Sequence, residues 1–442
     1  MSQDYSKIWH PFTQHALAGP EVEIERTEGA YLYAKDGRKI LDGISSWWVN
    51  THGHCHPEIV KAVQEQASKL EQVIFAGFTH APAEELAEKL LRVTKNNFQH
   101  VFYSDSGSTA VEVALKMAIG YWQHSEKPRK TVVALEGGYH GDTFGGMSAG
   151  GRGPFNDVYK DFLFDVVHLP FDDMEKSFEN VLKGGDVAAL ILEPLVLAAG
   201  GMKFYPLETL QKLSALCKKY DTLLIADEVM TGFGRTGTMF ACEQANIWPD
   251  IMCLSKGLTG GFLPMGATLC TSKIYDAFYR RDRSKMFFHS SSYTGNALAC
   301  AAALASLKIW ESEPVMARIA AISAAHRGAS ERFQKRKAIE NIRSLGTILA
   351  LDVIASEAKQ SSFKDGLLSR TAPGNDEKGY LNSIGPKLYE FFMQHNVLLR
   401  PLGNTVYILP PYCITEEELD HVYGIIDIAL DHLRDGSEQQ AA

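Results

Sequence analysis

A chain of 442 residues is longer than a single hydrophobic core usually supports, so we expect at least two structural units. Hydrophobic residues make up 45% of the chain and charged residues 22%, which is typical of a globular enzyme and excludes wholesale disorder. The net charge of -9, without any run rich in Lys and Arg, argues against a protein that binds nucleic acid.

The cysteines and the N-terminus indicate the compartment. Seven cysteines are scattered along the chain without the paired spacing of a metal site, which favours a reduced, cytoplasmic environment. The polar start at residues 1–7 lacks the apolar core of a signal peptide, and no uncharged apolar stretch is long enough to span a bilayer. We therefore expect a cytoplasmic protein without a membrane partner.

The first fifth of the chain predicts an arm, a small sheet and two helices. Residues 9–14 carry Trp, His, Pro and Phe in an order too irregular for a helix or a strand, which favours an arm packed on a neighbouring surface. Residues 22–41 predict short strands around an Asp-Gly turn, which favours a hairpin. Amphipathic helices are predicted at 58–73 and 82–96.

Three histidines at alternate positions, His52, His54 and His56, resemble metal ligands. However, Gly53 and Pro57 make this segment a loop, and no cluster of acidic or cysteine ligands accompanies it. A structural role is favoured over zinc, and we expect no metal site here.

Strands and helices alternate from residue 100 onward. The predicted strands lie at 100–103, 131–135, 187–192, 223–226 and 251–254, and the predicted helices at 108–123 and 207–219. This alternation predicts an α/β fold whose mainly parallel sheet carries helices on both faces. After a helix-rich connector at 296–334, we expect the C-terminal part to form a smaller α/β unit.

Lys256 follows the apolar run 251–254 and opens a turn rich in glycine. A lysine after a strand is most often a solvated surface residue. This run, however, predicts a strand buried on both faces, and the glycines allow the backbone to approach a ligand closely. Because open α/β sheets bind ligands at the carboxyl ends of their strands, Lys256 is a candidate to reach a bound cofactor.

Two turns between strands and helices offer further cofactor contacts. Ser106, Gly107 and Ser108 precede a predicted helix, whose N-terminal N–H groups suit a phosphate, although capping alone explains the serines equally well. Tyr139 follows two glycines after the next strand. Its flat side chain can cover an aromatic ligand or pack under the loop.

Asp227 ends an apolar run, where an unpaired carboxylate is costly and needs a partner. A metal ion bound by Asp227 and Glu228 is one answer, and a protonated pyridine nitrogen is another. An Asp that faces the ring nitrogen and a Lys that can bond to an aldehyde are what pyridoxal chemistry requires. Asp227 and Lys256 follow successive predicted strands, so both can face one crevice.

Four short motifs together resemble those of the fold-type I, class III (omega) aminotransferases, and the resemblance runs over nearly the whole chain. These motifs are Ser106-Gly107-Ser108, Tyr139-His140-Gly141, Asp227-Glu228-Val229 and Ser255-Lys256-Gly257. The resemblance implies the fold of a fold-type I PLP-dependent transferase and pyridoxal 5'-phosphate as its cofactor. Lys256 would bond to the cofactor and act as general base, Asp227 would keep the ring nitrogen protonated, and Tyr139 would stack on the ring.

The resemblance also implies a homodimer with its active sites at the subunit interface. Residues 106–108 would hold the cofactor phosphate, and the segment 288–296 is similar to the part that reaches into the partner's active site. In that segment Ser292 would add a hydroxyl group to the phosphate site, and Ser290 is a candidate for substrate contact.

The implied division of the chain has three parts. Residues 1–55 would form the N-terminal segment of the small domain and an active-site arm, residues 56–330 the large domain that binds the cofactor, and residues 331–442 the C-terminal small domain. Residues 356–379 are polar, rich in turn formers and without a family counterpart, which predicts an inserted surface loop.

Further motifs are similar to those of class members that aminate 8-amino-7-oxononanoate to 7,8-diaminononanoate in biotin synthesis. They are Trp9-His10-Pro11, Ser45-Ser46-Trp47-Trp48, His140-Gly141-Asp142-Thr143, Arg400-Pro401-Leu402-Gly403 and Pro410-Pro411-Tyr412. By this resemblance Arg400 would pair with the substrate carboxylate, which suits a planar guanidinium. Trp47 and Tyr407 would line the apolar chain of the substrate, next to Tyr139.

The amino donor stays open between S-adenosylmethionine and lysine. Phe12 stands where members that use S-adenosylmethionine commonly have a tyrosine, and the sequence around it is also similar to members that use lysine. Leu197 replaces a glutamine that is familiar in the class. Two alternatives remain: another omega-aminotransferase that acts on ornithine, 4-aminobutyrate or a diamine, and a cofactor-binding protein without turnover, against which the retention of Lys256 argues.

Overall fold

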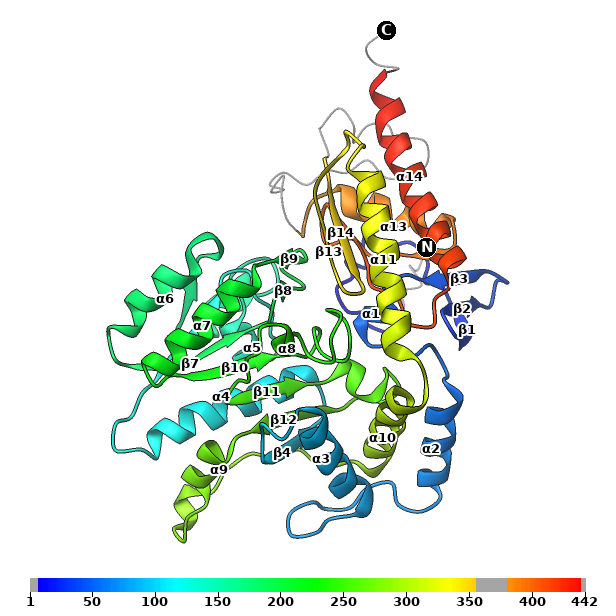
Figure 1. The fold of residues 1–442 in the computed structure, drawn as a ribbon. Coiled ribbons are helices and arrows are strands. Elements are labelled where there is room, and N and C mark those ends of the chain that lie inside the picture. The colour runs from blue at the N-terminus through cyan, green and yellow to red at the C-terminus, as the bar shows by residue number, and fades with distance from the viewer. Residues whose placement is uncertain (1–6, 355–379, 439–442) are drawn as a thin grey trace.

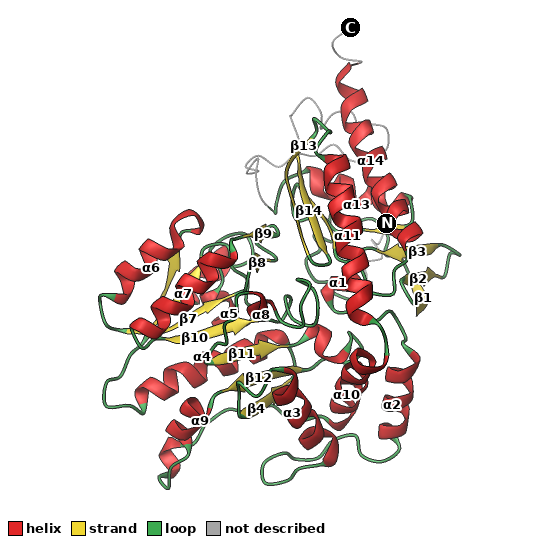
Figure 2. Ribbon diagram, in the orientation of Figure 1, coloured by secondary structure: helices red, strands yellow, loops and turns green. Residues whose placement is uncertain are grey.

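The structure is a computed structural model, and it describes residues 7–354 and 380–438 (Figure 1). The surface loop predicted at 356–379 lies outside the described residues. Within them the strands form sheets of seven, four, three and two strands. Figure 2 shows the strands of the large sheet side by side with helices around them.

The seven-stranded sheet is mainly parallel, as predicted. Its order is β4 (His100–Ser104), β12 (Gly266–Cys270), β11 (Ile251–Leu254), β10 (Leu223–Asp227), β7 (Val187–Leu192), β5 (Thr131–Leu135) and β6 (Val166–Leu169). Only β12 runs antiparallel to its two neighbours among these strands. The central strands β7, β10 and β11 are buried along their whole length, which explains their continuous apolar runs.

Helices cover both faces of this sheet. Leu190 and Leu192 of β7 belong to the same core as residues of α7 (Leu207–Lys219), whereas Ala189 and Ile191 belong to the core that contains α4 (Gly107–Gln123). Because successive side chains of a strand point to opposite faces, α4 and α7 lie on opposite sides of the sheet. Both helices were predicted within one residue of their observed bounds.

The helix predicted at 58–73 is shorter than expected. The structure has α2 (Pro57–Ala67), followed by a loop that leads to α3 (Ala81–Val93). The Gln66 side chain donates to the Leu70 carbonyl and the Ser68 hydroxyl donates to the Glu65 carbonyl. Such local bonds from side chains compete with the helical pattern, and the helix ends there.

The small sheets combine the two ends of the chain. The strands β1 (Ile24–Glu28), β2 (Tyr31–Ala34) and β3 (Lys39–Asp42) pair in order, and β3 also pairs with β15 (Val397–Leu398). A second sheet contains β13 (Ile339–Leu345), β14 (Ile348–Val353) and β16 (Thr405–Ile408). The boundaries 1–55, 56–330 and 331–442 stay a prediction.

Long helices connect and cover these sheets. They include α10 (Ala297–Ser312), α11 (Val315–Phe333), α13 (Ile384–Gln394) and α14 (Glu416–Glu438). In the part of the chain that the structure describes, no helix is long and apolar enough to cross a membrane. His52, His54 and His56 bond to Ser306, Asp42 and Glu313 respectively, so each has a different partner.

Candidate active site

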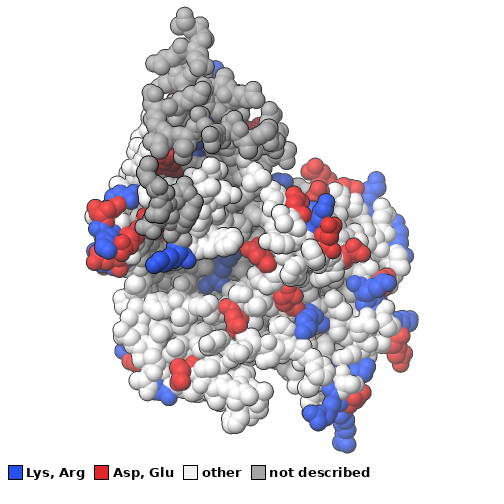
Figure 3. Space-filling view, turned by 180° about the vertical axis from the view of Figure 1, so that it is seen from behind, with Lys and Arg blue, Asp and Glu red and all other residues white. Residues whose placement is uncertain are grey.

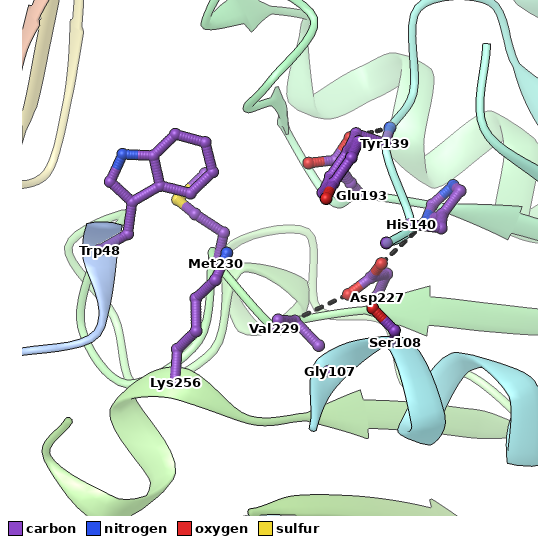
Figure 4. A pocket seen from close by; sticks show the side chains of 11 residues that line it. Trp48, Gly107, Ser108, Tyr139, His140, Glu193, Asp227, Val229, Met230 and Lys256 are labelled. Carbon is purple, nitrogen blue, oxygen red and sulfur yellow. Dashed lines mark hydrogen bonds and ion pairs between the residues drawn. The ribbon is translucent and has the colours of Figure 1, made fainter. Parts of the chain in front are cut away.

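A pocket opens at the carboxyl ends of β10 and β11, beside the start of α4 and the loop after β5 (Figure 4). Five of its lining residues were singled out from the sequence: Gly107, Ser108, Tyr139, Asp227 and Lys256. Lining residues that were not assigned a role are Trp48, His140, Gly141, Glu193, Val229 and Met230. Figure 4 shows Trp48 and Lys256 on one side of this pocket and Tyr139, His140 and Asp227 on the other.

Lys256 is the amine of the pocket. It lies two residues beyond the end of β11 and has a left-handed backbone, with φ of 46°, which is costly for a residue other than glycine. Its Nζ lies 4.5 Å from the centre of the Trp48 ring. Burial lowers the pKa of Lys256 to about 8, although the charges of Asp227 and Glu193 oppose this shift. A larger share of neutral amine at neutral pH makes it a better nucleophile toward an aldehyde.

The structure explains the glycines after Lys256 differently from the sequence-based prediction. A Cβ atom on Gly257 would lie 2.9 Å from the Phe233 side chain, and one on Gly261 would lie 2.8 Å from the Val49 backbone. These glycines therefore allow the chain to pack closely against its own neighbouring segments. The predicted close approach to a ligand was the wrong explanation for them.

The partner that Asp227 needs is His140. The His140 Nδ1 and the Asp227 Oδ2 lie 2.7 Å apart, and the Val229 N–H donates to the other carboxylate oxygen at 3.1 Å. Burial lowers the pKa of His140, but the hydrogen bond and the charge of Asp227 outweigh it, so the pKa lies above its usual value. Asp227 therefore favours the protonated form of the His140 imidazole.

Glu228 does not share the site of Asp227. Its carboxylate accepts from the Thr231 hydroxyl at 2.5 Å and from the N–H groups of Ala241 and Cys242 at 3.1 and 2.8 Å. The carboxylates of Asp227 and Glu228 thus bind different groups, and they do not converge on one cation. This geometry favours the second answer for Asp227, a protonated ring nitrogen.

Glu193 fixes the loop that carries Tyr139. Its carboxylate accepts from the N–H groups of Tyr139 and Ala198, both at 3.0 Å. Burial raises the pKa of Glu193 to about 7. Burial also raises the pKa of Tyr139, whose phenol stays neutral. Leu197, at the position where the class commonly has a glutamine, is fully buried.

The start of α4 combines a cap with an anion site. The Ser106 hydroxyl accepts from the Thr109 N–H at 3.2 Å, and the Thr109 hydroxyl accepts from the Ser106 N–H at 2.9 Å. Ser106 therefore takes the capping role that the sequence left open. Gly107 and Ser108 line the pocket at the N-terminus of a 17-residue helix, where N–H groups and the helix dipole attract a phosphate.

The predicted substrate contacts Phe12, Trp47 and Arg400 lie together outside the cofactor pocket. Arg400 Nη2 donates to the Phe12 carbonyl at 3.1 Å, and its guanidinium carbon lies 5.1 Å from the Trp47 ring centre. The rings of Phe12 and Trp47 lie 5.5 Å apart. Phe155 connects this group to the pocket, because its ring lies 5.8 Å from Phe12 and 5.9 Å from Tyr139.

Tyr407 lies behind the pocket wall. It is only 3% exposed, and its hydroxyl accepts from the Trp48 indole N–H at 3.0 Å. The neighbouring tryptophans therefore separate: Trp48 lines the pocket, and Trp47, which is 39% exposed, lies beside Arg400. The sequence offered no signal that chose between them, and it gave none for Phe155 or for Tyr380, whose ring packs 4.7 Å from Phe155.

Ser290 and Ser292 lie on the surface, away from the pocket of their own chain. The Ser292 carbonyl accepts from the Gln72 side chain at 3.1 Å, and the Ser291 hydroxyl bonds to Asp105 at 2.5 Å. This places the segment against the loop 68–80 and next to the start of α4. The contacts predicted for both serines involve a partner subunit, so they stay predictions.

Comparison with known proteins decides the family. Residues 14–430 match the family model described as aminotransferase class-III. The chain belongs to the class-III aminotransferases. This aminotransferase is 44% identical over 441 residues to the adenosylmethionine-8-amino-7-oxononanoate aminotransferase of Synechococcus elongatus, with 96% of this chain and 99% of the relative covered. The resemblance seen in the motifs is confirmed.

Solved structures agree with this family. The aminotransferase is similar to the crystal structure of adenosylmethionine-8-amino-7-oxononanoate aminotransferase from Methanocaldococcus jannaschii, with a TM-score of 0.86, 33% identity, and 98% and 97% of the two chains covered. It is also similar to a PLP-bound amine transaminase from an uncultivated Pseudomonas species, with a TM-score of 0.86, 31% identity, and 97% and 99% covered. The predicted α/β fold of fold-type I PLP-dependent transferases is confirmed.

Proposed function

We propose that this class-III aminotransferase is adenosylmethionine-8-amino-7-oxononanoate aminotransferase, which converts 8-amino-7-oxononanoate to 7,8-diaminononanoate in biotin biosynthesis. The observation that carries this proposal is one continuous site, in which Lys256 and Asp227 lie in the pocket and Arg400 lies beside an aromatic wall at its outer side. The relatives with this name support it. Because an amine transaminase has the same fold, the substrate assignment rests on that outer wall.

Pyridoxal 5'-phosphate is the cofactor of this aminotransferase, and the residues of the pocket fit it. When bound, the cofactor supplies an aldehyde and an electron-withdrawing ring. Gly107 and Ser108 would bind its phosphate at the start of α4, and Asp227 would hold a proton on its ring nitrogen. His140 keeps the Asp227 carboxylate in place, at a distance of 2.7 Å.

Lys256 binds and moves protons in this site. Its Nζ is neutral in part near neutral pH because burial lowers its pKa to about 8. Lys256 would be the amine that holds the cofactor through its aldehyde, and its free Nζ would hold and release a proton beside the reacting carbon atoms. Trp48 covers Lys256 from one side and Tyr139 forms the opposite wall, so both exclude water from the reacting atoms (Figure 4).

The outer wall binds the oxononanoate. Arg400 pairs with its carboxylate through a planar guanidinium that suits two parallel hydrogen bonds. Phe12 and Trp47 pack along its apolar chain, next to Tyr139. Tyr407 lies behind the inner pocket instead, where its hydroxyl accepts from the Trp48 indole N–H.

The proposal includes a homodimer in the cytoplasm. Large apolar side chains are exposed on the loop 68–80 and the segment 286–296, which lie against each other: Ile74 66%, Phe78 61%, Phe288 64% and Tyr293 63%. Contiguous apolar surface of this kind marks an interface. Figure 3 shows a broad face on which charged side chains are sparse. The partner would bring Ser292 to the phosphate and Ser290 to the substrate. The seven cysteines are free, which suits a reduced compartment.

A screen of half-reactions tests this function. The purified protein should show the visible absorbance of pyridoxal phosphate attached to lysine, and an amino donor should bleach it. We expect S-adenosylmethionine or lysine to bleach the band and 8-amino-7-oxononanoate to restore it. Bleaching by 4-aminobutyrate or ornithine alone, without restoration by the oxononanoate, would overturn the assignment to biotin biosynthesis.

A further inference from the structure

The backbone has the left-handed conformation at Trp47 and Trp48 and at the two residues before them. The residues of α1 (Ser45–Trp48) have φ angles of 52°, 44°, 74° and 70°, all in the left-handed region. The Trp48 N–H donates to the Ile44 carbonyl at 3.0 Å, and the Val49 N–H donates to the Ser45 carbonyl at 3.0 Å. These are helical bonds of the opposite hand. None of the four residues is glycine, so each adopts this conformation against its own preference.

Asp42 is the residue that holds this turn. It is fully buried at the end of β3. Its Oδ1 accepts from the N–H groups of Ile44 and Ser46 at 3.2 and 3.0 Å, and its Oδ2 accepts from the Ser46 hydroxyl at 2.7 Å. His54 Nε2 lies 2.9 Å from Oδ2 and keeps the carboxylate in position. One carboxylate thus binds two groups of the left-handed segment and the N–H of the residue that precedes it.

The left-handed turn separates the two indoles. Trp48 lies over Lys256, and the Lys256 Nζ is 4.5 Å from the centre of the Trp48 ring. Trp47, in contrast, lies beside Arg400 and Phe12. Adjacent residues thereby serve the cofactor pocket and the outer wall. A strained backbone persists only where the surroundings enforce it, and such strain concentrates at functional sites.

We propose that Asp42 is a positioning residue of the active site: through the left-handed turn it places Trp48 against Lys256 and Trp47 against Arg400. The part that concerns Trp47 rests on the proposed function, because it assigns that indole to the substrate wall. The part that concerns Trp48 depends only on the cofactor pocket.

A pair of double variants tests this role. Asp42→Ala should weaken cofactor binding about tenfold or more, because the turn loses hydrogen bonds to a charged group. Gly and Ala at position 46 both remove the hydroxyl, but only Gly accepts the left-handed backbone freely. We therefore expect Asp42→Ala/Ser46→Gly to bind the cofactor about fivefold more tightly than Asp42→Ala/Ser46→Ala.

The measurement uses the full-length chain stripped of cofactor and titrated with pyridoxal phosphate, followed by quenching of tryptophan emission. Equal dissociation constants for the two double variants would overturn the proposal, as would an Asp42→Ala variant that binds the cofactor like wild type. If Asp42→Ala does not fold, the single variants decide. Ser46→Gly should then melt at a higher temperature than Ser46→Ala and bind the cofactor at least as tightly, and the reverse order would overturn the proposal.

Steady-state kinetics extend the test to Trp47. The KM for 8-amino-7-oxononanoate should rise in Asp42→Ala. It should recover in Asp42→Ala/Ser46→Gly and stay high in Asp42→Ala/Ser46→Ala. Glycine rescue of cofactor binding without any turnover of the oxononanoate by wild type would refute the proposed function and leave the role of Asp42 intact. If Asp42→Ala lowers the melting temperature but leaves cofactor affinity unchanged, Asp42 only stabilises the fold, and the positioning role is refuted.

Discussion

The inner pocket and the outer wall of the site are built in different ways. The pocket takes Asp227 and Lys256 from the ends of the neighbouring strands β10 and β11 and Tyr139 from the loop after β5, and hydrogen bonds below 3.2 Å hold Asp227 and the Tyr139 loop. The wall takes Phe12 and Arg400 from opposite ends of the chain, and ring contacts hold it together with one hydrogen bond to the backbone. The proposed chemistry therefore rests on a hydrogen-bonded sheet edge and the proposed specificity on ring packing, so we expect that each can be broken separately.

The largest effect should come from the amine of the pocket. Lys256→Ala should lower transamination by about 10²–10⁴-fold, because the general base is lost. The cofactor should still bind without a covalent bond. Borohydride treatment followed by peptide mapping should find cofactor on Lys256 in wild type and none in the variant. Turnover at the wild-type rate would contradict the role of Lys256.

A change behind the cofactor should have the next largest effect. His140→Leu leaves the buried Asp227 carboxylate without its hydrogen-bonded partner, and we expect cofactor affinity to fall about 10–100-fold. Titration of the stripped protein with pyridoxal phosphate measures this. His168→Leu is the control, since His168 bonds to the Gly150 carbonyl at 2.8 Å and does not line the pocket. Equal losses in both variants would point to general destabilisation.

A change in the outer wall should leave the pocket chemistry intact. Arg400→Ala should raise the KM for 8-amino-7-oxononanoate about tenfold or more, because a charge-assisted pair with the carboxylate is lost. The rate of the donor half-reaction should change little. Arg400→Lys keeps the charge without the planar fork and should give an intermediate KM. A donor half-reaction that slows as much as the acceptor one would deny the separation of wall and pocket.

The smallest effect is a pH dependence. Because burial lowers the pKa of Lys256 to about 8, the amine is charged below that pH and neutral above it. The rate at which pyridoxal phosphate attaches to the stripped protein should rise about tenfold per pH unit up to about pH 8 and then level off. A free alkylamine, with a pKa of about 10.4, is the control and should keep rising to higher pH. A protein rate that follows the control would contradict the lowered pKa.

Local pattern predicted the inner pocket well. Apolar runs and glycine-rich turns identified the strands that carry Asp227 and Lys256, and parallel strands bring such ends to one edge. The partner of Asp227 could not be foreseen, because His140 lies 87 positions away and its imidazole gives no signal in the sequence. The choice of Trp48 over Trp47 for the pocket depended on the hand of one backbone turn.

By itself, the sequence determined the α/β alternation, the family and three residues of the pocket, Lys256, Asp227 and Tyr139, because these follow from hydrophobic periodicity and short motifs within single segments. Only the tertiary structure decided that Ser106 caps α4, that the glycines after Lys256 pack closely against other segments of the chain, and that Asp42 holds a left-handed turn. The physical reason is that the glycines meet distant segments of the chain, whereas the two local hydrogen bonds depend on a backbone geometry that the residue types alone do not specify.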